Sequence, residues 1–248
     1  MTFIDAVTKS SLVRGASLPT TFSGELLPVR SLKRAILSRS PAVIAEVKYA
    51  SPHGRTGATL PPGPLAAAMA AGGAVAISVL TEPTVFAGDP LFIREVRRHV
   101  SLPVLRKDIL VHPSQIRESR AIGADAVLLI ASVLADDLAS FVDLAISCGL
   151  EPVVEVGSMT EAESALATKT EIIGINNRDL FTLRIDPDRA GKIAPLVRSG
   201  DKIPIAMSGI TRPDQVTEYM KTCAAVLIGS SISSASDPRR ATEEFVCM

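Results

Sequence analysis

The amino-acid sequence predicts an α/β fold of the (β/α)8 TIM-barrel class, and the pattern of apolar runs is the main indication. Eight short runs rich in Val, Ile and Leu recur from residue 43 onward, and their starts lie 21 to 32 residues apart. Each interval holds one strand, one helix and two loops, and near-continuous apolar runs are typical of parallel strands buried on both faces. Strands that alternate eight times with helices favour a closed barrel, whereas a doubly wound open sheet is the competing fold.

The length of 248 residues suits a single barrel domain of this class. Residues 1–42 precede the first strand, include an expected helix at Leu32–Leu37, and should form an N-terminal helical extension packed on a barrel of residues 43–248. The expected strands are Val43–Lys48, Val75–Thr81, Val104–Leu110, Ala126–Ala131, Glu151–Val156, Ile172–Arg178, Ile203–Gly209 and Ala225–Ser230. The expected helices between them include Pro113–Ile122, Ala135–Cys148, Thr160–Ala167 and Arg212–Lys221.

The composition excludes several classes of protein. Lys plus Arg and Asp plus Glu both number 26, so no overall charge favours nucleic acid or a membrane surface as a partner. The three cysteines form no CxxC pair or Cys/His cluster, so neither a disulfide framework nor a zinc site is expected. The uncharged stretch Gly57–Thr81 is interrupted by three prolines and a Gly-Gly pair, which favours loop, helix, turn and strand over a membrane span. The first residues lack the pattern of a secretory signal, and we expect a cytoplasmic protein.

Polar residues near the expected strand ends indicate where chemistry takes place. In parallel α/β barrels the ligand binds at the carboxyl ends of the strands, where all eight loops converge. Glu46 and Lys48 alternate along the first strand and therefore point the same way, while Lys107, Glu155 and Asn176 come near the ends of three other strands. Each residue alone could be a structural ion pair or a strand-end cap. Because buried charges are costly unless they are paired or used, the set together indicates general acid–base catalysis.

Small residues after the seventh and eighth expected strands indicate a phosphate site. Gly209 follows the seventh, and Gly229 with Ser230 follows the eighth, where backbone N–H groups of barrels commonly bind an anion. Glycine and serine are also common turn formers, which is the alternative explanation. Ser51, in the loop after the first strand, could close over the same ligand.

The three histidines support neither a metal site nor a serine-hydrolase triad. His53 falls on a loop, His99 on a helix and His112 at a helix start, and their spacing fits no metal triad. No nucleophile-elbow signature is present either. We expect all three to be surface residues.

Taken in order, eight segments resemble the indole-3-glycerol phosphate synthase family of tryptophan biosynthesis over about residues 41 to 235. The Glu-x-Lys and Ser-Pro elements followed by Arg-Lys-Asp, Val-Glu-Val, Ile-Asn-Asn-Arg-Asp-Leu and Ser-Gly-Ile are highly specific in combination. The segments are PAVIAEVKYASPHG, AISVLTEPTVFAGD, SLPVLRKDILVHPSQI, GADAVLLIASVL, GLEPVVEV, IIGINNRDL, AMSGI and VLIGSSI.

The resemblance implies a carbon–carbon lyase that needs no cofactor or metal. Its substrate would be the phosphosugar 1-(2-carboxyphenylamino)-1-deoxyribulose 5-phosphate, closed to an indole with loss of carbon dioxide and water. Lys107 resembles the general acid that protonates the ribulose carbonyl, and Glu155 the base that restores aromaticity. Lys48 resembles the lysine that pairs with the substrate carboxylate and assists loss of the hydroxyl. Glu46 would orient and tune the two lysines.

The resemblance also assigns the binding residues by position in the matching motifs. Those that would hold polar groups of the substrate are Asn176, Arg178 and Ser208. Those that would hold the phosphate are Ser51, Gly209, Gly229 and Ser230, and the expected walls of the pocket for the aromatic ring are Phe86 and Leu128. The sequence is compatible with a monomer but does not determine the oligomeric state.

Three departures from the family pattern lie at this expected site. Met207 stands where the family usually has glutamate, Ile109 where it usually has phenylalanine, and Tyr49-Ala50 where basic residues are common. With these departures, one alternative is a barrel that binds a phosphorylated ligand with a retuned pocket or without catalysis. Another phosphosugar isomerase or epimerase is a further alternative, although the pair of lysines, Lys48 and Lys107, counts against it.

Overall fold

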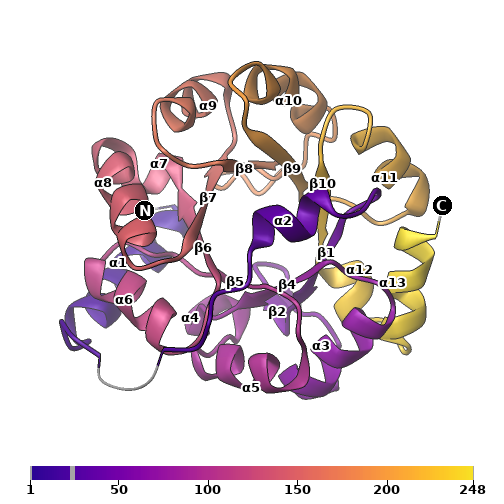
Figure 1. The fold of residues 1–248 in the computed structure, drawn as a ribbon, viewed down its shortest axis with the longest axis horizontal. Helices are drawn as coiled ribbons and strands as arrows, with labels where there is room; N and C mark the ends of the chain where they lie inside the picture. The colour runs from indigo at the N-terminus through magenta and orange to yellow at the C-terminus, as the bar shows by residue number, and fades with distance from the viewer. Residues whose placement is uncertain (1, 23–25, 248) are drawn as a thin grey trace.

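The structure is a computed structural model that describes residues 2–22 and 26–247. The chain folds into a closed barrel of eight parallel strands surrounded by helices (Figure 1). Around the barrel the strands follow the order β1-β10-β9-β8-β7-β6-β5-β4, so the predicted barrel is confirmed and the open sheet is excluded. The barrel strands are β1 (Val43–Val47), β4 (Ala76–Leu80), β5 (Val104–Lys107), β6 (Ala126–Ile130), β7 (Glu151–Val156), β8 (Ile172–Asn176), β9 (Ile203–Met207) and β10 (Ala225–Ile228). A separate antiparallel hairpin is formed by β2 (Ala50–Ser51) and β3 (Gly54–Arg55).

Helices precede the barrel and separate its strands, and local signals fix several of their starts. His112 accepts a hydrogen bond from the Ser114 N–H and caps α6, whose first residue is Pro113. Within the described residues, no helix is long and apolar enough to cross a membrane. The helices are α1 (Phe3–Ala16), α2 (Leu32–Leu37), α3 (Pro62–Ala71), α4 (Pro83–Phe86), α5 (Leu91–His99), α6 (Pro113–Ala121), α7 (Ala131–Leu134), the 3-10 turn η1 (Ala135–Asp137), α8 (Leu138–Ser147), α9 (Met159–Leu166), α10 (Arg189–Ser199), α11 (Pro213–Tyr219), α12 (Ser230–Ser233) and α13 (Pro238–Val246).

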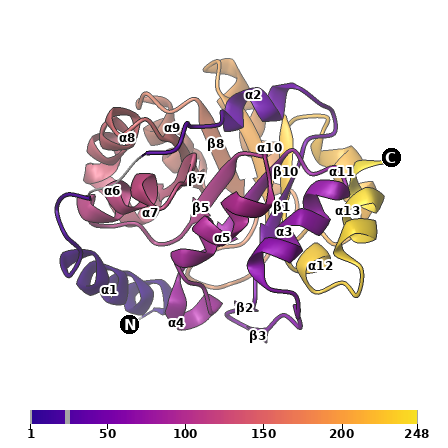
Figure 2. The same ribbon diagram turned by 60° about the horizontal axis from the view of Figure 1, so that its bottom comes forward.

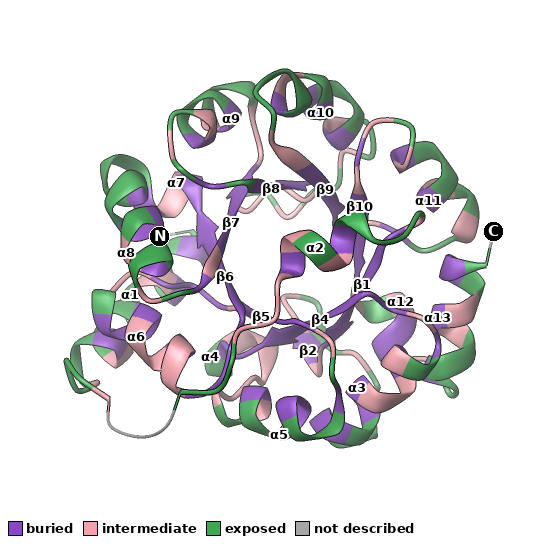
Figure 3. Cartoon of the chain, viewed as in Figure 1, coloured by how far each residue is buried: buried purple, intermediate pink, exposed green. Residues whose placement is uncertain are grey.

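Alternation of side chains along the strands creates two hydrophobic clusters. On β1, Val43, Ala45 and Val47 belong to the cluster between the sheet and the helices. Ile44 belongs to the other cluster, which fills the barrel interior. The strands are accordingly buried along their length, whereas the helices alternate buried and exposed faces (Figure 3). Residues that share the Ile44 face, including Glu46 and Lys48, therefore point toward the barrel axis.

The two N-terminal helices lie at opposite ends of the barrel (Figure 2). The buried side chains Leu32 and Ile36 of α2 join the interior cluster, and the Lys33 N–H donates to Glu151 at the start of β7 (2.8 Å). This helix therefore closes the amino-terminal end. In contrast, α1 packs near the carboxyl end of β5, where Ser11 donates to the Ile109 carbonyl. The predicted helical extension is confirmed, apart from residues 1 and 23–25, which lie outside the described part.

All eight predicted strands are present, but several end earlier than predicted. The third ends at Lys107 rather than Leu110, because the backbone of Ile109 bonds to side chains instead of to a neighbouring strand: its N–H donates to Asp108 and its carbonyl accepts from Ser11. The seventh ends at Met207, since Ser208 and Gly209 turn into positive φ (68° and 79°). These early ends matter because they turn the chain at the residues predicted to carry function.

Candidate active site

The carboxyl ends of the strands surround two adjoining cavities of about 170 and 150 Å³. The two cavities have in common Lys48, Lys107, Arg178, Ser208 and Ser230. The other predicted residues of the larger cavity are Ser51, Phe86, Leu128, Glu155 and Asn176. The smaller cavity adds Glu46, Gly209 and Gly229. Every residue that the sequence predicted for the site therefore lines one of these two spaces.

Glu46 lies between the two lysines at the centre of the mouth. One carboxylate oxygen is 3.8 Å from Lys48 Nζ and the other is 3.5 Å from Lys107 Nζ. Ser78 Oγ on the neighbouring strand donates to the same carboxylate at 3.3 Å. Because the Glu46 side chain is only 3% exposed, its charge is balanced by these ammonium groups rather than by bulk water.

The two lysines have opposite electrostatic environments. Burial lowers the pKa of Lys48, and the positive charges of Lys107 and Arg178 add to this effect against the attraction of Glu46. Burial also opposes the charged form of Lys107, but the carboxylates of Glu46 and Glu155 outweigh it and raise the pKa of this lysine. Lys107 is therefore held as an ammonium group, as a proton donor at neutral pH must be.

Glu155 lies at the end of β7 and has the properties of a general base. Its Oε1 accepts a hydrogen bond from Asn176 Nδ2 at 2.8 Å. Burial raises the pKa of Glu155, although Lys107 and the Asn176 amide favour the ionised form. A carboxylate with a raised pKa takes up a proton more readily near neutral pH than an ordinary one.

These shifts predict the pH dependence of kcat/KM. The acid limb should reflect ionisation of Glu155. Its midpoint should lie above roughly pH 4.3, the usual pKa of a glutamate. The alkaline limb should reflect Lys48 and lie below the range of an ordinary lysine. The variant Asn176→Ala removes a hydrogen bond that favours the carboxylate, and should move the acid limb further upward. Initial rates measured across the pH range test this, and an unmoved acid limb in Asn176→Ala would rule out Glu155 as its source.

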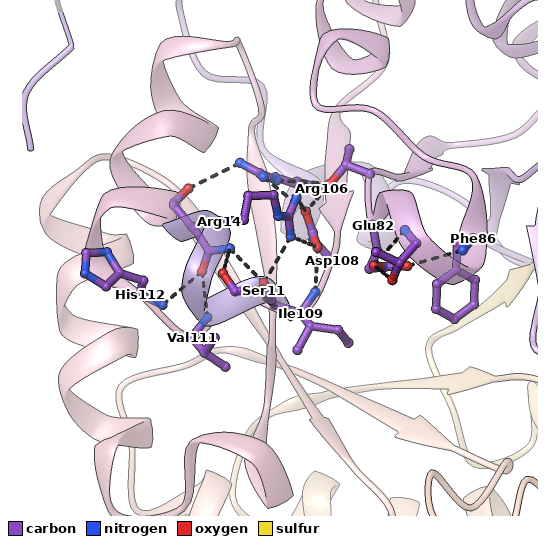
Figure 4. Close-up of polar contacts among 12 residues, drawn as sticks. Ser11, Arg14, Glu82, Phe86, Arg106, Asp108, Ile109, Val111 and His112 are labelled. Carbon is purple, nitrogen blue, oxygen red and sulfur yellow. Dashed lines mark hydrogen bonds and ion pairs between the residues drawn. The ribbon is translucent and has the colours of Figure 1, made fainter. Parts of the chain in front are cut away.

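The larger cavity has many apolar side chains in its lining, which suits a planar ring. Leu128 is almost fully buried on β6, and Phe86 faces the cavity from α4, with Lys48 Nζ 6.0 Å from its ring centre. Glu82 fixes this short helix by accepting hydrogen bonds from three backbone N–H groups, including Phe86 N (3.2 Å; Figure 4). The apolar lining comprises Leu80, Phe86, Ile109, Leu128, Ile130, Leu180 and Leu183.

The smaller cavity combines glycine and serine residues with the cationic side chains Lys48, Lys107 and Arg178, a lining that suits a phosphate. At Gly229 a Cβ would lie 2.6 Å from Glu46 Oε1, so a larger residue there would push the carboxylate away from its place between the two lysines. Gly209 has a φ of 79°, which also favours glycine. Ser231, which sequence reasoning did not include, lines the same cavity and donates to the Ile210 carbonyl at 2.8 Å.

One side-chain contact joins two loops that line the larger cavity. His53 Nε2 lies 3.2 Å from Arg178 Nη1, which links the β2–β3 hairpin to the loop after β8. Arg178 also donates to the Leu183 carbonyl at 2.9 Å. His53 is exposed, as predicted, but this contact with a predicted substrate-binding residue was missed. Ser51 lines the larger cavity and its hydroxyl is engaged within the hairpin, accepting from His53 N at 3.2 Å.

Residues 2–22 and 26–247 contain no group of three or more His, Cys, Asp or Glu side chains that could bind a metal ion. A larger cavity of about 700 Å³ lies away from the mouth, between the segment before α2 and helices α5 and α6. Arginines and apolar residues line it, and neither a carboxylate nor a strand end contributes. We therefore assign the chemistry to the barrel mouth.

Comparison with known proteins agrees with this geometry. A family model described as indole-3-glycerol phosphate synthase matches residues 7–245. Proteins of that name are similar in sequence: one from Nocardioides sp. is 46% identical over 82% of this chain and 79% of its own length. Another from Shouchella clausii is 44% identical over 88% of this chain and 87% of its own. A third from Aquifex aeolicus is 40% identical over 86% and 84%.

Solved structures with low sequence identity have the same fold. A thiamine phosphate pyrophosphorylase from Pyrococcus furiosus aligns with a TM-score of 0.61 at 20% identity, over 87% of this chain and 96% of that one. A tryptophan synthase from M. tuberculosis aligns with a TM-score of 0.65 at 12% identity, over 88% and 98%. At these identities the likeness concerns the barrel alone.

Proposed function

Because this chain belongs to the indole-3-glycerol phosphate synthase family, we propose that it closes the ring of 1-(2-carboxyphenylamino)-1-deoxyribulose 5-phosphate. The products would be indole-3-glycerol phosphate, carbon dioxide and water, which makes the enzyme a carbon–carbon lyase. One observation carries the proposal: Lys107, Lys48 and Glu155 converge from three strand ends on a cavity with many apolar side chains, and a smaller cavity lined by Gly209 and Gly229 adjoins it.

The substrate would lie along both cavities. Its aromatic ring would occupy the larger cavity between Phe86 and Leu128, and its phosphate the smaller cavity beside Gly209, Gly229 and Ser230. This orientation brings the carbonyl of the sugar to the central charged groups. Fixing both ends supplies proximity, which can account for a large share of the rate enhancement.

Ring closure would use Lys107 as the general acid. The ring carbon that bears the carboxylate attacks the sugar carbonyl carbon, and Lys107 gives its proton to the carbonyl oxygen. Lys48 would pair with the substrate carboxylate until the carbon–carbon bond breaks, and carbon dioxide leaves with restoration of the ring electrons. Glu46 touches both lysines and would keep each ammonium group in place.

Dehydration would then complete the indole. The hydroxyl formed at the former carbonyl leaves as water with a proton from the Lys48 ammonium group. Glu155 removes a proton from the carbon bonded to nitrogen, and the new five-membered ring becomes aromatic. Asn176 holds the Glu155 carboxylate for this task. Arg178 and Ser208 line both cavities and would contact polar groups of the sugar phosphate.

The departures from the family pattern are compatible with this reaction. Met207 is fully buried in the interior cluster, and its Sδ and Cε lie against Gly174. Among the described residues that line the two cavities, Met207 is not included, whereas Ile109 contributes to the apolar wall. We further propose that residues 1–248 act as one domain in the cytoplasm on this small phosphosugar.

Incubating the purified protein with the carboxyphenylamino substrate tests the proposed function. Indole fluorescence should appear, with one carbon dioxide released for each indole formed. Binding of the substrate without product would instead favour a non-catalytic ligand-binding barrel. Isomerisation or epimerisation of other phosphosugars without indole formation would favour the remaining alternative.

A further inference from the structure

Lys107 stands between two oppositely charged, fully buried residues at the end of β5. The Arg106 and Asp108 side chains have no exposed surface, and Arg106 Nη2 donates to Asp108 Oδ2 at 3.1 Å. Arg106 Nη1 also donates to Glu118 of α6 at 2.8 Å, and Thr81 Oγ1 donates to Asp108 at 2.6 Å. The backbone on both sides of Lys107 is therefore held by charged groups that take no part in the proposed chemistry.

The N-terminal helix α1 completes this buried network (Figure 4). Arg14 forms a bidentate pair with Asp108: Nη2 is 2.6 Å from Oδ1 and Nη1 is 3.0 Å from Oδ2. Ser11 donates to the Ile109 carbonyl and accepts from Gln115 Nε2 at 2.8 Å. Two-pronged arginine–carboxylate pairs fix geometry as well as charge. Helix α1 is thus attached to the two residues that directly follow Lys107.

Asp108 connects Arg14 with the backbone that turns after Lys107. Its Oδ1 accepts both from Arg14 and from the N–H of Ile109, the latter at 2.8 Å. Burial alone would raise the pKa of Asp108, but Arg106 and Arg14 hold it below its usual range, so this carboxyl stays ionised. Without Arg14, Oδ1 would keep only the Ile109 N–H and would become open to water, because the Arg14 side chain is itself 23% exposed.

We propose that Arg14 is a positioning residue, which acts through Asp108 to hold the Lys107 ammonium group in line with Glu46 and the reacting carbonyl. The inference depends on the role proposed for Lys107. The distance that Arg14 would control is the 3.5 Å between Lys107 Nζ and Glu46 Oε2. Small errors in the placement of an acid reduce its rate strongly, even when the substrate still binds.

Arg14→Ala is the direct test, with ring-closure kinetics measured per folded molecule. The kcat should fall about 10–100-fold while KM changes by less than about twofold, since displacement of a catalytic group by about 1 Å costs rate rather than binding. The alkaline limb of the pH profile, which reflects Lys48, should also move upward, because displacement of the Lys107 ammonium group weakens a repulsion that lowers the pKa of Lys48. Arg14→Lys, which keeps the charge but not the two-pronged pair, should restore only part of kcat.

Controls separate this role from a purely structural one. Arg239→Ala removes an exposed arginine that pairs with Glu243 on α13, and should leave kcat unchanged. If Arg14→Ala lowers the yield of folded protein, Ser11→Ala offers a milder break in the same attachment and should still lower kcat. Wild-type kcat and an unmoved alkaline limb in the folded Arg14 and Ser11 variants would overturn the inference but leave the proposed function intact. Absence of indole from the wild-type protein would overturn both.

Discussion

Lys107→Ala is expected to lower kcat for indole formation by about 10²–10⁴-fold, the range for loss of a positioned general acid. The physical reason is that alanine supplies neither the proton nor the positive charge required as the carbonyl oxygen gains negative charge. Binding should change much less, because the ring and phosphate contacts of the two cavities remain. Steady-state kinetics followed by indole fluorescence give both values.

Lys169→Ala is the matched control for this variant. Lys169 pairs with Asp143 on the outer surface, and its side chain is 73% exposed, so its loss should leave kcat unchanged. Normal turnover by Lys107→Ala would refute the assigned mechanism even though the family membership stands.

Glu155→Gln should lower activity by a similar factor of about 10²–10⁴, because an amide cannot accept the proton that is lost as the indole forms.

Glu155→Gln should also increase the free energy of unfolding. The folded state raises the pKa of Glu155, mainly through burial, so the ionised carboxylate is less favourable in the fold than in the unfolded chain. The glutamine oxygen can still accept from Asn176. A gain of about 1 kcal/mol, or roughly 2–4 °C in Tm, is expected at neutral pH.

The pH dependence of this gain provides its own check. A group whose pKa is raised by folding stabilises the fold at low pH and loses that contribution as pH rises through the folded-state pKa. The advantage of Glu155→Gln should therefore be absent in acid and appear as Glu155 ionises. Thermal unfolding of both proteins across the pH range measures it. A uniform shift at every pH, or the same gain in the exposed control Glu163→Gln, would contradict the explanation.

The strands could be predicted because each barrel strand is buried on both faces. This double burial leaves an almost continuous apolar run, which is visible without knowledge of any neighbour. The strand ends were less predictable. Asp108 leaves the ladder to bind Arg14, a partner 94 residues away, and no local pattern carries that information. Helix α10 was not among the predicted helices. Its buried residues Ala190, Ile193, Ala194 and Val197 do repeat at helical spacing, but Pro195 within it is a sequence signal against a helix.

The site could be predicted because alternation along a strand determines which side chains reach the barrel mouth. Lys107 points inward, whereas its neighbours Arg106 and Asp108 point outward and are buried beneath the helices. What could not be predicted depends on contacts between loops. The bridge from His53 to Arg178 joins segments 125 residues apart, and the capping of α4 by Glu82 is evident only once Phe86 is placed.

The position of α1 has a practical consequence for any polypeptide joined ahead of Thr2. Such an addition would emerge at the end of the barrel that also carries α4 and the β2–β3 hairpin, which is the end where the candidate site opens (Figure 2). A bulky affinity tag or fusion partner there could hinder substrate binding at the barrel mouth or displace Arg14. A C-terminal tag extends from α13, which packs against α3 on the outer wall. Kinetic work on this enzyme is therefore better done with the tag at that end.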